Sequence, residues 1–129
     1  MSDILAPVSP GELLDKITIL RIKAARLRDT GALENVRVEL ALLAATWRDC
    51  GCAARAAPAD EQALQAVNER LWDIEDRIRL KEAARSFDGE FIELARSVYL
   101  SNDERAAIKK RINVRLGSRI VEEKSYTPY

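Results

Sequence analysis

The chain has 129 residues, of which 47% are apolar and 33% are charged. That length fits one domain, and the apolar content excludes a disordered chain, which combines low hydrophobicity with high net charge. Lys and Arg number 21, as do Asp and Glu, so the chain has no global attraction to nucleic acid or to a membrane surface. His is absent, which excludes His-containing metal sites and His-based catalytic triads.

The first predicted helix runs from Ser9 to Gly31. Ser9 is the expected N-cap, and Glu12 three residues later completes a capping box. Apolar residues then recur at spacings of four and three, which indicates one buried stripe on a helix. The stripe consists of Leu13, Ile17, Leu20, Ala24 and Leu27. Gly31 is the expected C-terminal breaker.

A second stripe over 33–47, which ends on Trp47, predicts a second helix. The short connection between the two helices predicts an antiparallel hairpin. Residues 50–59, CGCAARAAPA, are read as an inter-helix loop. Cys50 and Cys52 are too few for a structural zinc site, which takes four ligands, so we expect free thiols in a reducing cytosol. The alternative is a redox role for the pair, although the usual redox motif has two residues between its cysteines.

Three further helices are predicted in the second half of the chain. A long third helix covers 60–85, and a fourth covers 88–99. The apolar stripe of the third helix consists of Leu64, Val67, Leu71, Ile74 and Ile78. Ser101 and Glu104 form a second capping box, which predicts a break there and a fifth helix over 102–116. No run alternates with the period of a strand, so no sheet is expected.

These elements predict an all-α fold, a four- to five-helix bundle with an N-terminal helical hairpin and an extended C-terminal tail. The apolar spacing of the first three helices suits near-parallel packing. We expect a single domain over 1–129, with an N-terminal arm (1–8), the inter-helix loop (50–59) and the tail (117–129). The first residues lack the pattern of a signal peptide, and no segment approaches the ~20 apolar residues that span a bilayer, so no membrane contact and a cytoplasmic location are expected.

Four runs resemble a family of small proteobacterial helical proteins catalogued as a domain of unknown function. They are SPGELLDKITILRIK (9–23), LWDIEDRIR (71–79), FIELARSVYLSNDERAAIKKRIN (91–113) and GSRIVEEKSYTPY (117–129). The resemblance covers most of the chain, fades across 30–60 and implies no activity. It does single out the polar residues inside these runs, which are Asp15, Lys16, Asp76, Arg96, Asn102, Asp103, Arg105, Lys109, Asn113, Glu123, Lys124 and Tyr126.

Carboxylates on two helices form the candidate metal site. Glu12 and Asp15 are three residues apart on the first helix, as are Asp73 and Asp76 on the third. Spaced carboxylates on two helices can bind Mg²⁺, which prefers oxygen ligands, and helical nucleotide pyrophosphatases use such pairs. The alternative interpretation is ordinary pairing on a helix surface, for which Asp73 and Arg77 have the favourable spacing.

The fifth predicted helix is basic and is the candidate anion site. Arg105 shares a face with Lys109, and Arg111 shares one with Arg115. Such a face can bind a phosphate or a nucleotide, whereas nucleic acid is not favoured because the domain has no net positive charge. The alternative is a solvated face paired with the acidic third helix.

The two Trp residues have different expected positions. Trp47 lies on an apolar stripe and is expected in the core, whereas Trp72 lies beside its stripe, where it can line a groove or a subunit interface.

The tail has apolar side chains at Ile120, Val121 and Tyr126, and these favour docking on the bundle over a free end. Docking can occur on the same copy or by exchange with a second copy in a homodimer.

No motif names a reaction, so the sequence predicts a non-catalytic binding or interaction module of the bacterial cytoplasm. Its partner would be a protein or a small anionic ligand, and no cofactor is expected. The candidate ligand-binding residues are Lys16, Arg96, Asn102, Arg105, Lys109, Arg111, Asn113, Lys124 and Tyr126. The alternatives are a Mg²⁺-dependent nucleotide or phosphoester hydrolase that uses the four carboxylates, and a phosphate-binding protein that uses the fifth helix.

Overall fold

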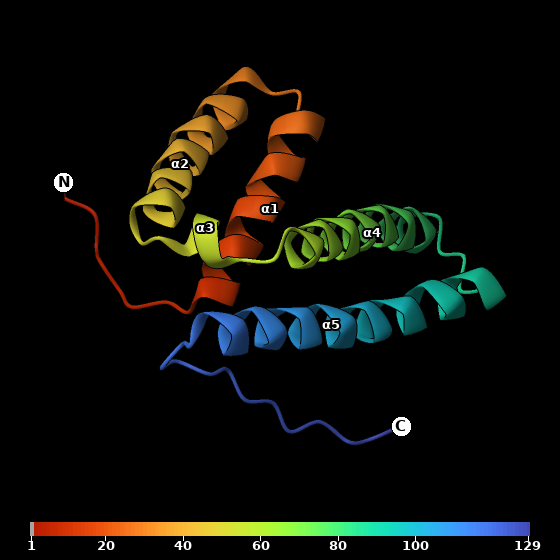
Figure 1. Ribbon diagram of the computed structural model, residues 1–129. Helices are drawn as coiled ribbons and strands as arrows, with labels where there is room; N and C mark the ends of the chain where they lie inside the picture. Colours follow the sequence, from red (N-terminus) through yellow and green to blue (C-terminus); the bar gives the residue numbers. More distant parts are fainter. Residues whose placement is uncertain (1) are drawn as a thin grey trace.

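The computed structural model describes residues 2–129, which contain helices and no strand. The helices are α1 (Pro10–Arg26), α2 (Thr30–Asp49), α3 (Cys52–Arg55), α4 (Pro58–Ala83) and α5 (Gly89–Leu116). Helices α1 and α2 form one antiparallel hairpin and α4 and α5 form another, with the single turn of α3 between them (Figure 1). The predicted all-α bundle with an N-terminal hairpin is therefore confirmed.

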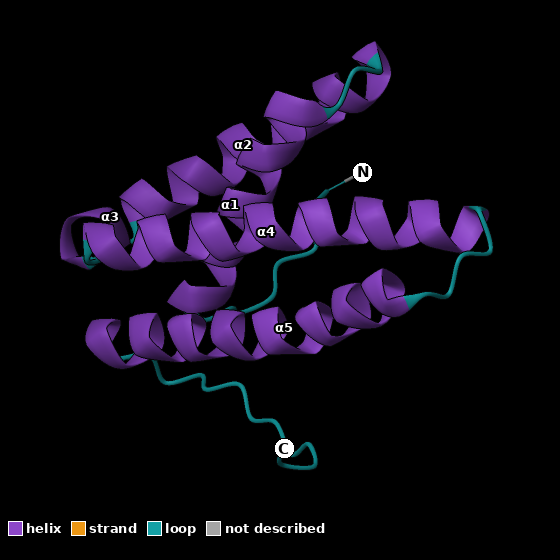
Figure 2. Cartoon of the chain, turned by 90° about the vertical axis from the view of Figure 1, so that its right-hand side faces the viewer, coloured by secondary structure: helices purple, strands orange, loops and turns teal. Residues whose placement is uncertain are grey.

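The two hairpins cross each other in both views (Figures 1 and 2). The predicted near-parallel packing therefore holds for the first two helices and is wrong for the third. Helix α1 contacts α2, α4 and α5, whereas α2 packs mainly on α1 and α3. The most deeply buried apolar side chains come from α1, α4 and α5 and mark their crossing as the centre of the core: Leu14, Ile17, Leu64, Val67 and Ile112. Ile17 lies on the stripe predicted for the first helix, and Leu64 and Val67 lie on that of the third. Trp47 is buried as expected.

The first helix ends earlier than predicted. It ends at Arg26, and Gly31 lies in the first turn of α2 instead of after α1. Asp29 is the reason, because its side chain accepts a hydrogen bond from the amide of Ala32 at 2.8 Å and so caps α2. Leu27 adopts an extended conformation and ends α1 without a glycine.

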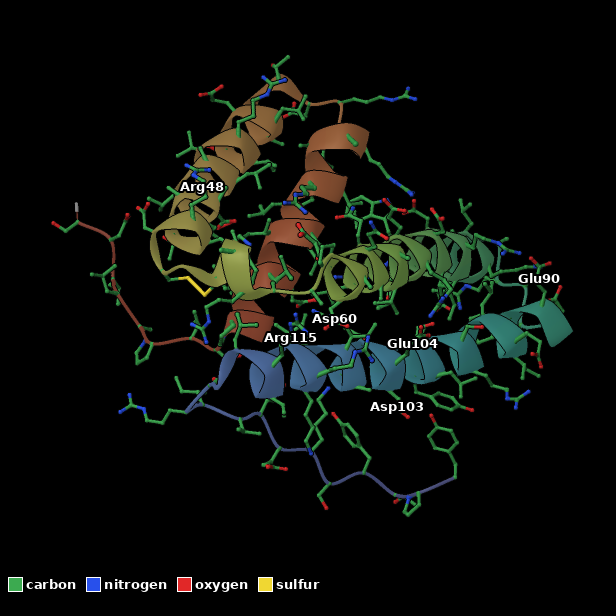
Figure 3. All side chains as sticks on the ribbon, in the orientation of Figure 1. Arg48, Asp60, Glu90, Asp103, Glu104 and Arg115 are labelled. Atoms are coloured by element: carbon green, nitrogen blue, oxygen red, sulfur yellow. A yellow bond between two sulfur atoms is a disulfide. The ribbon has the colours of Figure 1, made fainter. Side chains whose placement is uncertain are left out.

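The predicted break at Ser101 is also wrong, because α5 runs without interruption from Gly89 to Leu116. The Ser101 hydroxyl is buried and accepts a hydrogen bond from Arg70 Nε at 3.3 Å, and the Glu104 carboxylate is paired with the same guanidinium. The two residues that resemble a capping box therefore join α5 to α4. Figure 3 shows Glu104 on the side of α5 that faces α4.

The predicted loop over 50–59 is more ordered than expected. It contains α3 and the first residues of α4, and a disulfide joins Cys50 to Cys52, so the expectation of free thiols is not met (Figure 3). Arg55 in α3 donates to the carbonyl oxygen of Leu116 at 2.5 Å, and Arg115 donates to the carbonyl oxygen of Arg55 at 3.0 Å. These bonds hold the end of α5 against the connection between the hairpins.

Gly11 allows α1 to approach α5 closely. A Cβ atom at this position would lie 2.6 Å from the carbonyl oxygen of Lys109 and 2.8 Å from Asn113 Oδ1. The Gly11 amide donates to that same Asn113 oxygen at 2.7 Å, which satisfies one of the free N–H groups at the start of α1. The start of α1 is thus fastened to α5 by backbone and side-chain contacts.

Two segments without helix flank the bundle. Residues 2–9 form the arm, in which Ile4 and Leu5 are exposed, and 118–129 form the tail. The tail runs along the side of α5 that lies opposite α4 (Figures 1 and 2). Within residues 2–129, no helix has the length and apolar character needed to cross a membrane.

Candidate functional site

A buried polar network occupies the crossing of α1, α4 and α5. Asp15 is 1% exposed and accepts hydrogen bonds from Arg105 Nε at 2.8 Å and from Asn68 Nδ2 at 2.9 Å. A second guanidinium nitrogen of Arg105 donates to the other oxygen of Asp15, so the pair is bidentate. The same Asn68 nitrogen donates to the hydroxyl of Thr18 at 2.9 Å. One carboxylate on α1 therefore orients a side chain of α4 and a side chain of α5.

The network holds its charged groups in their charged forms. Burial alone would raise the pKa of Asp15, but hydrogen bonds from Arg105 and Asn68 and the positive charges of Arg105 and Lys109 outweigh it, so that pKa is lowered. The hydrogen bond to Asp15 raises the pKa of Arg105. Both shifts therefore favour the charged forms of this pair.

Lys109 forms a second ionic cluster one turn farther along α5. It is 8% exposed, and its ammonium group donates to Glu12 at 2.7 Å and to Glu122 of the tail at 3.0 Å. Burial opposes its charge, but these two carboxylates outweigh burial, so the pKa of Lys109 is raised. Glu12 was expected to complete the capping box of α1. The Ser9 hydroxyl does accept from the Glu12 amide at 3.1 Å, whereas the Glu12 carboxylate pairs with Lys109.

The other members of the basic face are also paired. Arg111 lies on another side of α5 and donates to Asp60 of α4 at 2.7 Å, and Asn113 accepts from the Gly11 amide. Figure 3 places Asp60 between the start of α4 and α5. Arg105, Lys109 and Arg111 therefore each have a carboxylate partner within the fold. The fourth cation, Arg115, donates to a backbone carbonyl oxygen. This geometry favours the alternative that the basic residues hold the helices together.

The four candidate metal ligands are not brought together. Glu12 and Asp15 lie on α1 and are paired with cations of α5, whereas Asp73 on α4 is paired with Arg26. Asp76 is exposed. Within residues 2–129, no group of three or more carboxylate, Cys or His side chains could hold a metal ion. The arrangement therefore does not favour the Mg²⁺ hypothesis.

A pocket of about 460 Å³ lies where the three helices meet, beside the Asp15 network. It is called the crossing pocket below. Its apolar walls are Ile19, Leu71 and Trp72, and its polar residues are Asn68, Asn102 and Arg105 together with Glu75, Asp76 and Arg79. Trp72 is half-buried and lines this pocket, which is one of the two placements expected for it. The crossing pocket thus combines apolar walls with polar groups that the network has already oriented.

The tail encloses two further hollows against α5. Lys109, Asn113 and Lys124 line one of about 210 Å³, and Asn102, Lys124 and Tyr126 line part of another of about 690 Å³. The larger one is called the tail groove below. Tyr129 donates to Asp103, which Figure 3 shows on the side of α5 that faces the tail. The tail thus contacts α5 of its own chain through Glu122 and Tyr129. The side chains expected to dock it are exposed instead, namely Ile120, Val121 and Tyr126.

The remaining candidate residues lie away from the crossing pocket. Lys16 is exposed on α1. Arg96 is exposed on α5 and donates to Glu93 at 3.1 Å. The Lys124 ammonium lies 6.0 Å from the ring centre of Tyr126, at the range of a cation–π contact. These side chains do not form one site with Arg105.

Sequence reasoning missed Asn68, Thr18 and Gly11. A signal for Asn68 was present, because it lies on the apolar stripe of its helix, one turn after the buried Leu64. A polar residue on a buried stripe needs a hydrogen-bonding partner, and that partner was Asp15 on another helix. No local pattern indicates that Gly11 meets Asn113.

The chain was compared with curated proteins, with solved structures and with models of protein families. No curated protein and no solved structure matches it. One family model, described as a family of unknown function (DUF6165), matches residues 5–129. The match includes α1, α4, α5 and the tail, and hence every residue of the crossing pocket. The chain therefore belongs to the family of unknown function DUF6165.

Proposed function

We propose that this chain is a non-catalytic binding module that holds a small molecule in the crossing pocket. The observation that carries the proposal is the pocket itself, at about 460 Å³ between three helices. Small-molecule sites have volumes of this order, and they combine apolar walls with a few convergent polar groups. Trp72 and Leu71 supply such walls, and Asn68, Asn102 and Arg105 supply such polar groups.

The proposal that the module is non-catalytic rests on two buried charged groups, Asp15 in the network beside the pocket and Lys109 one turn farther along α5. A general acid or base works best when its pKa lies near the operating pH. Hydrogen bonds and opposite charges outweigh burial at both Asp15 and Lys109, so the pKa of the carboxyl moves down and that of the ammonium moves up. Both groups thus move away from neutral pH, which suits residues that hold helices together.

We also propose the bacterial cytoplasm as the location, and the cysteines provide the test. In a reducing compartment Cys50 and Cys52 would be thiols, whereas an oxidising compartment would preserve the disulfide described above. Rapid alkylation of intact cells, followed by mass spectrometry, should label both residues. Protein that resists alkylation until a reductant is added would contradict the cytoplasmic proposal.

Thermal unfolding in the presence of a ligand panel tests binding. The panel holds nucleosides, nucleotides, amino acids and sugar phosphates, each with and without Mg²⁺. A ligand at one hundred times its dissociation constant stabilises by about 2.7 kcal/mol, which raises the melting temperature by several degrees. We expect the increase to be lost in Trp72→Ala and kept in Tyr126→Ala, because Tyr126 lines only the tail groove.

Turnover is measured on the same panel. Hydrolysis of any phosphoester or nucleotide at a rate abolished by Asp76→Ala would contradict the non-catalytic proposal. Binding that survives Trp72→Ala and is lost in Tyr126→Ala would move the site to the tail groove. Binding that weakens steeply with salt and is lost in Arg111→Ala would favour an anion site on α5 instead.

A further inference from the structure

Asn68 is the most deeply buried side chain that lines the crossing pocket, at 4% exposed. Its amide nitrogen donates to Asp15 and to Thr18, both at 2.9 Å. The nitrogen and the oxygen of an amide point in different directions, so this anchorage directs Oδ1 away from the two partners. Among the described residues no group donates a hydrogen bond to this oxygen. It is also not one of the side-chain atoms that are buried without a hydrogen-bond partner, so it is accessible to a ligand. Asn68 therefore offers the pocket a fixed hydrogen-bond acceptor.

Arg105 places donors beside that acceptor, because both residues bind the same carboxylate. Its Nε and one terminal nitrogen donate to the two oxygens of Asp15, which fixes the plane of the guanidinium. The other terminal nitrogen carries two further N–H groups. Asn102 lies three residues before Arg105 on α5 and adds an amide, which can donate and accept, to the same lining. One end of the pocket thus presents a donor next to an acceptor.

The walls beside this polar end suit a flat, apolar body. Trp72 is half-buried and lies four residues after Asn68, so both are on one face of α4. Leu71 and Ile19 complete the wall from α4 and α1. An indole exposed in such a wall can stack on any ring with a π face, and such stacking tolerates many ring types.

The charges around the pocket disfavour an anionic ligand. The charge of Arg105 is neutralised by Asp15, and Arg79 is paired with Glu75 at 3.2 Å. Asp76 adds a carboxylate to the lining. The balance of the lining is therefore neutral to negative, which opposes a phosphate and leaves hydrogen bonding and stacking as the available interactions.

We infer that the crossing pocket binds an uncharged planar heterocycle whose edge carries adjacent hydrogen-bond donors and acceptors, as the base of a nucleoside does. The heterocycle stacks on Trp72, its N–H donates to Asn68 Oδ1, and its acceptor receives a hydrogen bond from Arg105. Carboxylates at the far end of the pocket can accept hydrogen bonds from sugar hydroxyls. This inference rests on the proposed binding function and adds the class of ligand.

Isothermal titration of the intact protein with adenosine, guanosine, cytidine and uridine tests the inference. We expect at least one nucleoside to bind, and its analogue with the donor nitrogens of the base methylated to bind at least about tenfold more weakly. Its 5′-monophosphate should bind no more tightly than the nucleoside at low ionic strength.

Variants of the wall test the stacking. Trp72→Phe keeps a ring and should bind within about threefold of the parent, whereas Trp72→Leu keeps an apolar side chain and should bind at least about fivefold more weakly. The half-exposed position makes both variants compatible with folding. Tyr126→Ala, in the tail groove, is the matched control and should bind as the parent does.

Each other outcome overturns the inference. If nucleosides do not bind but another ligand of the panel raises the melting temperature through Trp72, the binding function stands and the ligand class is wrong. A monophosphate that binds tenfold more tightly than its nucleoside, with strong salt dependence, would assign recognition to the phosphate. Equal affinities of the Phe and Leu variants would exclude stacking on Trp72.

Discussion

Replacement of Asp15 by Ala tests whether the buried network holds α1, α4 and α5 together. Asp15 is 1% exposed, and the side chain of its partner Arg105 is 29% exposed. Removing one partner of a buried ion pair costs about 3–5 kcal/mol, because the other charge is left without compensation. Since Arg105 keeps some contact with water, we expect the lower end, about 3 kcal/mol. For a domain of this size that lowers the melting temperature by roughly 10–15 °C.

Asp73→Ala is the matched control, because Asp73 is also a helical aspartate paired with an arginine. Its side chain is 58% exposed and that of Arg26 is 36% exposed. Exposed pairs contribute about 0–1 kcal/mol, so this variant should unfold near the parent temperature. Denaturant unfolding followed by circular dichroism measures both free energies of unfolding. Equal decreases in the free energy of unfolding of Asp15→Ala and Asp73→Ala would refute the argument from burial.

Acid unfolding gives an independent readout of the same group. The net effect of the hydrogen bonds and charges described above is to lower the pKa of Asp15 below its ordinary value of 3.8 in the folded state. A lowered pKa contributes stability above the ordinary value, and this contribution is lost as the pH falls through the folded pKa. The difference in the free energy of unfolding between the parent and Asp15→Ala should therefore stay constant from about pH 5 to pH 7 and become smaller in stronger acid. A difference that narrows as the pH rises would contradict the direction of this shift.

Three further predictions follow from particular contacts. Gly11→Ala should destabilise by about 1–3 kcal/mol in denaturant unfolding, since its Cβ would lie 2.6 Å from a backbone oxygen. Gly31→Ala should be neutral or stabilising, since its Cβ would meet only a side-chain oxygen of Asp29, at 3.4 Å. Glu122→Gln should lower the NMR order parameters of the tail. In the parent the same release should occur in acid, because the contact with Lys109 lowers the pKa of Glu122 and is lost as the pH falls through that pKa. Ser101→Ala should cost less than about 1 kcal/mol, because only a hydrogen bond at 3.3 Å is removed, and a loss of 2 kcal/mol would favour an N-cap at this position.

Apolar periodicity predicted the helices well where one face of a helix is buried. Leu13 and Ile17 in α1 and Leu64 and Val67 in α4 lie in the core as their spacing indicated. Periodicity failed to predict how the hairpins cross, because it records which face is buried and not which helix covers it. The crossing requires α1 to approach α5 closely at Gly11, which has no side chain to contact the carbonyl oxygen of Lys109.

The break predicted at Ser101 shows why a capping motif can mislead. Ser and Glu three residues apart are typical of a helix start, but the same side chains also form contacts between helices. Arg70 of α4 binds both Ser101 and Glu104, so neither is needed to cap α5. The position of α4 decides between the two roles. The residues of the motif carry no information about that position.

The candidate site was predictable only in part for a similar reason. The resemblance to the family singled out Asp15, Asn102 and Arg105, and the position of Trp72 beside its stripe indicated a groove. The pairing of Arg105 with Asp15 spans 90 residues of sequence, so spacing within a helix could not show that this cation was already neutralised. That pairing changes the chemistry expected of the pocket from anion binding to hydrogen bonding and stacking.

The Asp15 network links the stability of the fold to the proposed binding site. The acceptor of Asn68 and the free donors of Arg105 are oriented because their other groups bind Asp15. Loss of that carboxylate should therefore weaken ligand binding even at temperatures where the variant remains folded, whereas loss of Glu122 should release the tail and leave the crossing pocket unchanged. A protein that used the tail groove would show the opposite pattern, since its ligand would depend on the tail and tolerate changes at Asp15. The two substitutions thus decide which side of α5 carries the function.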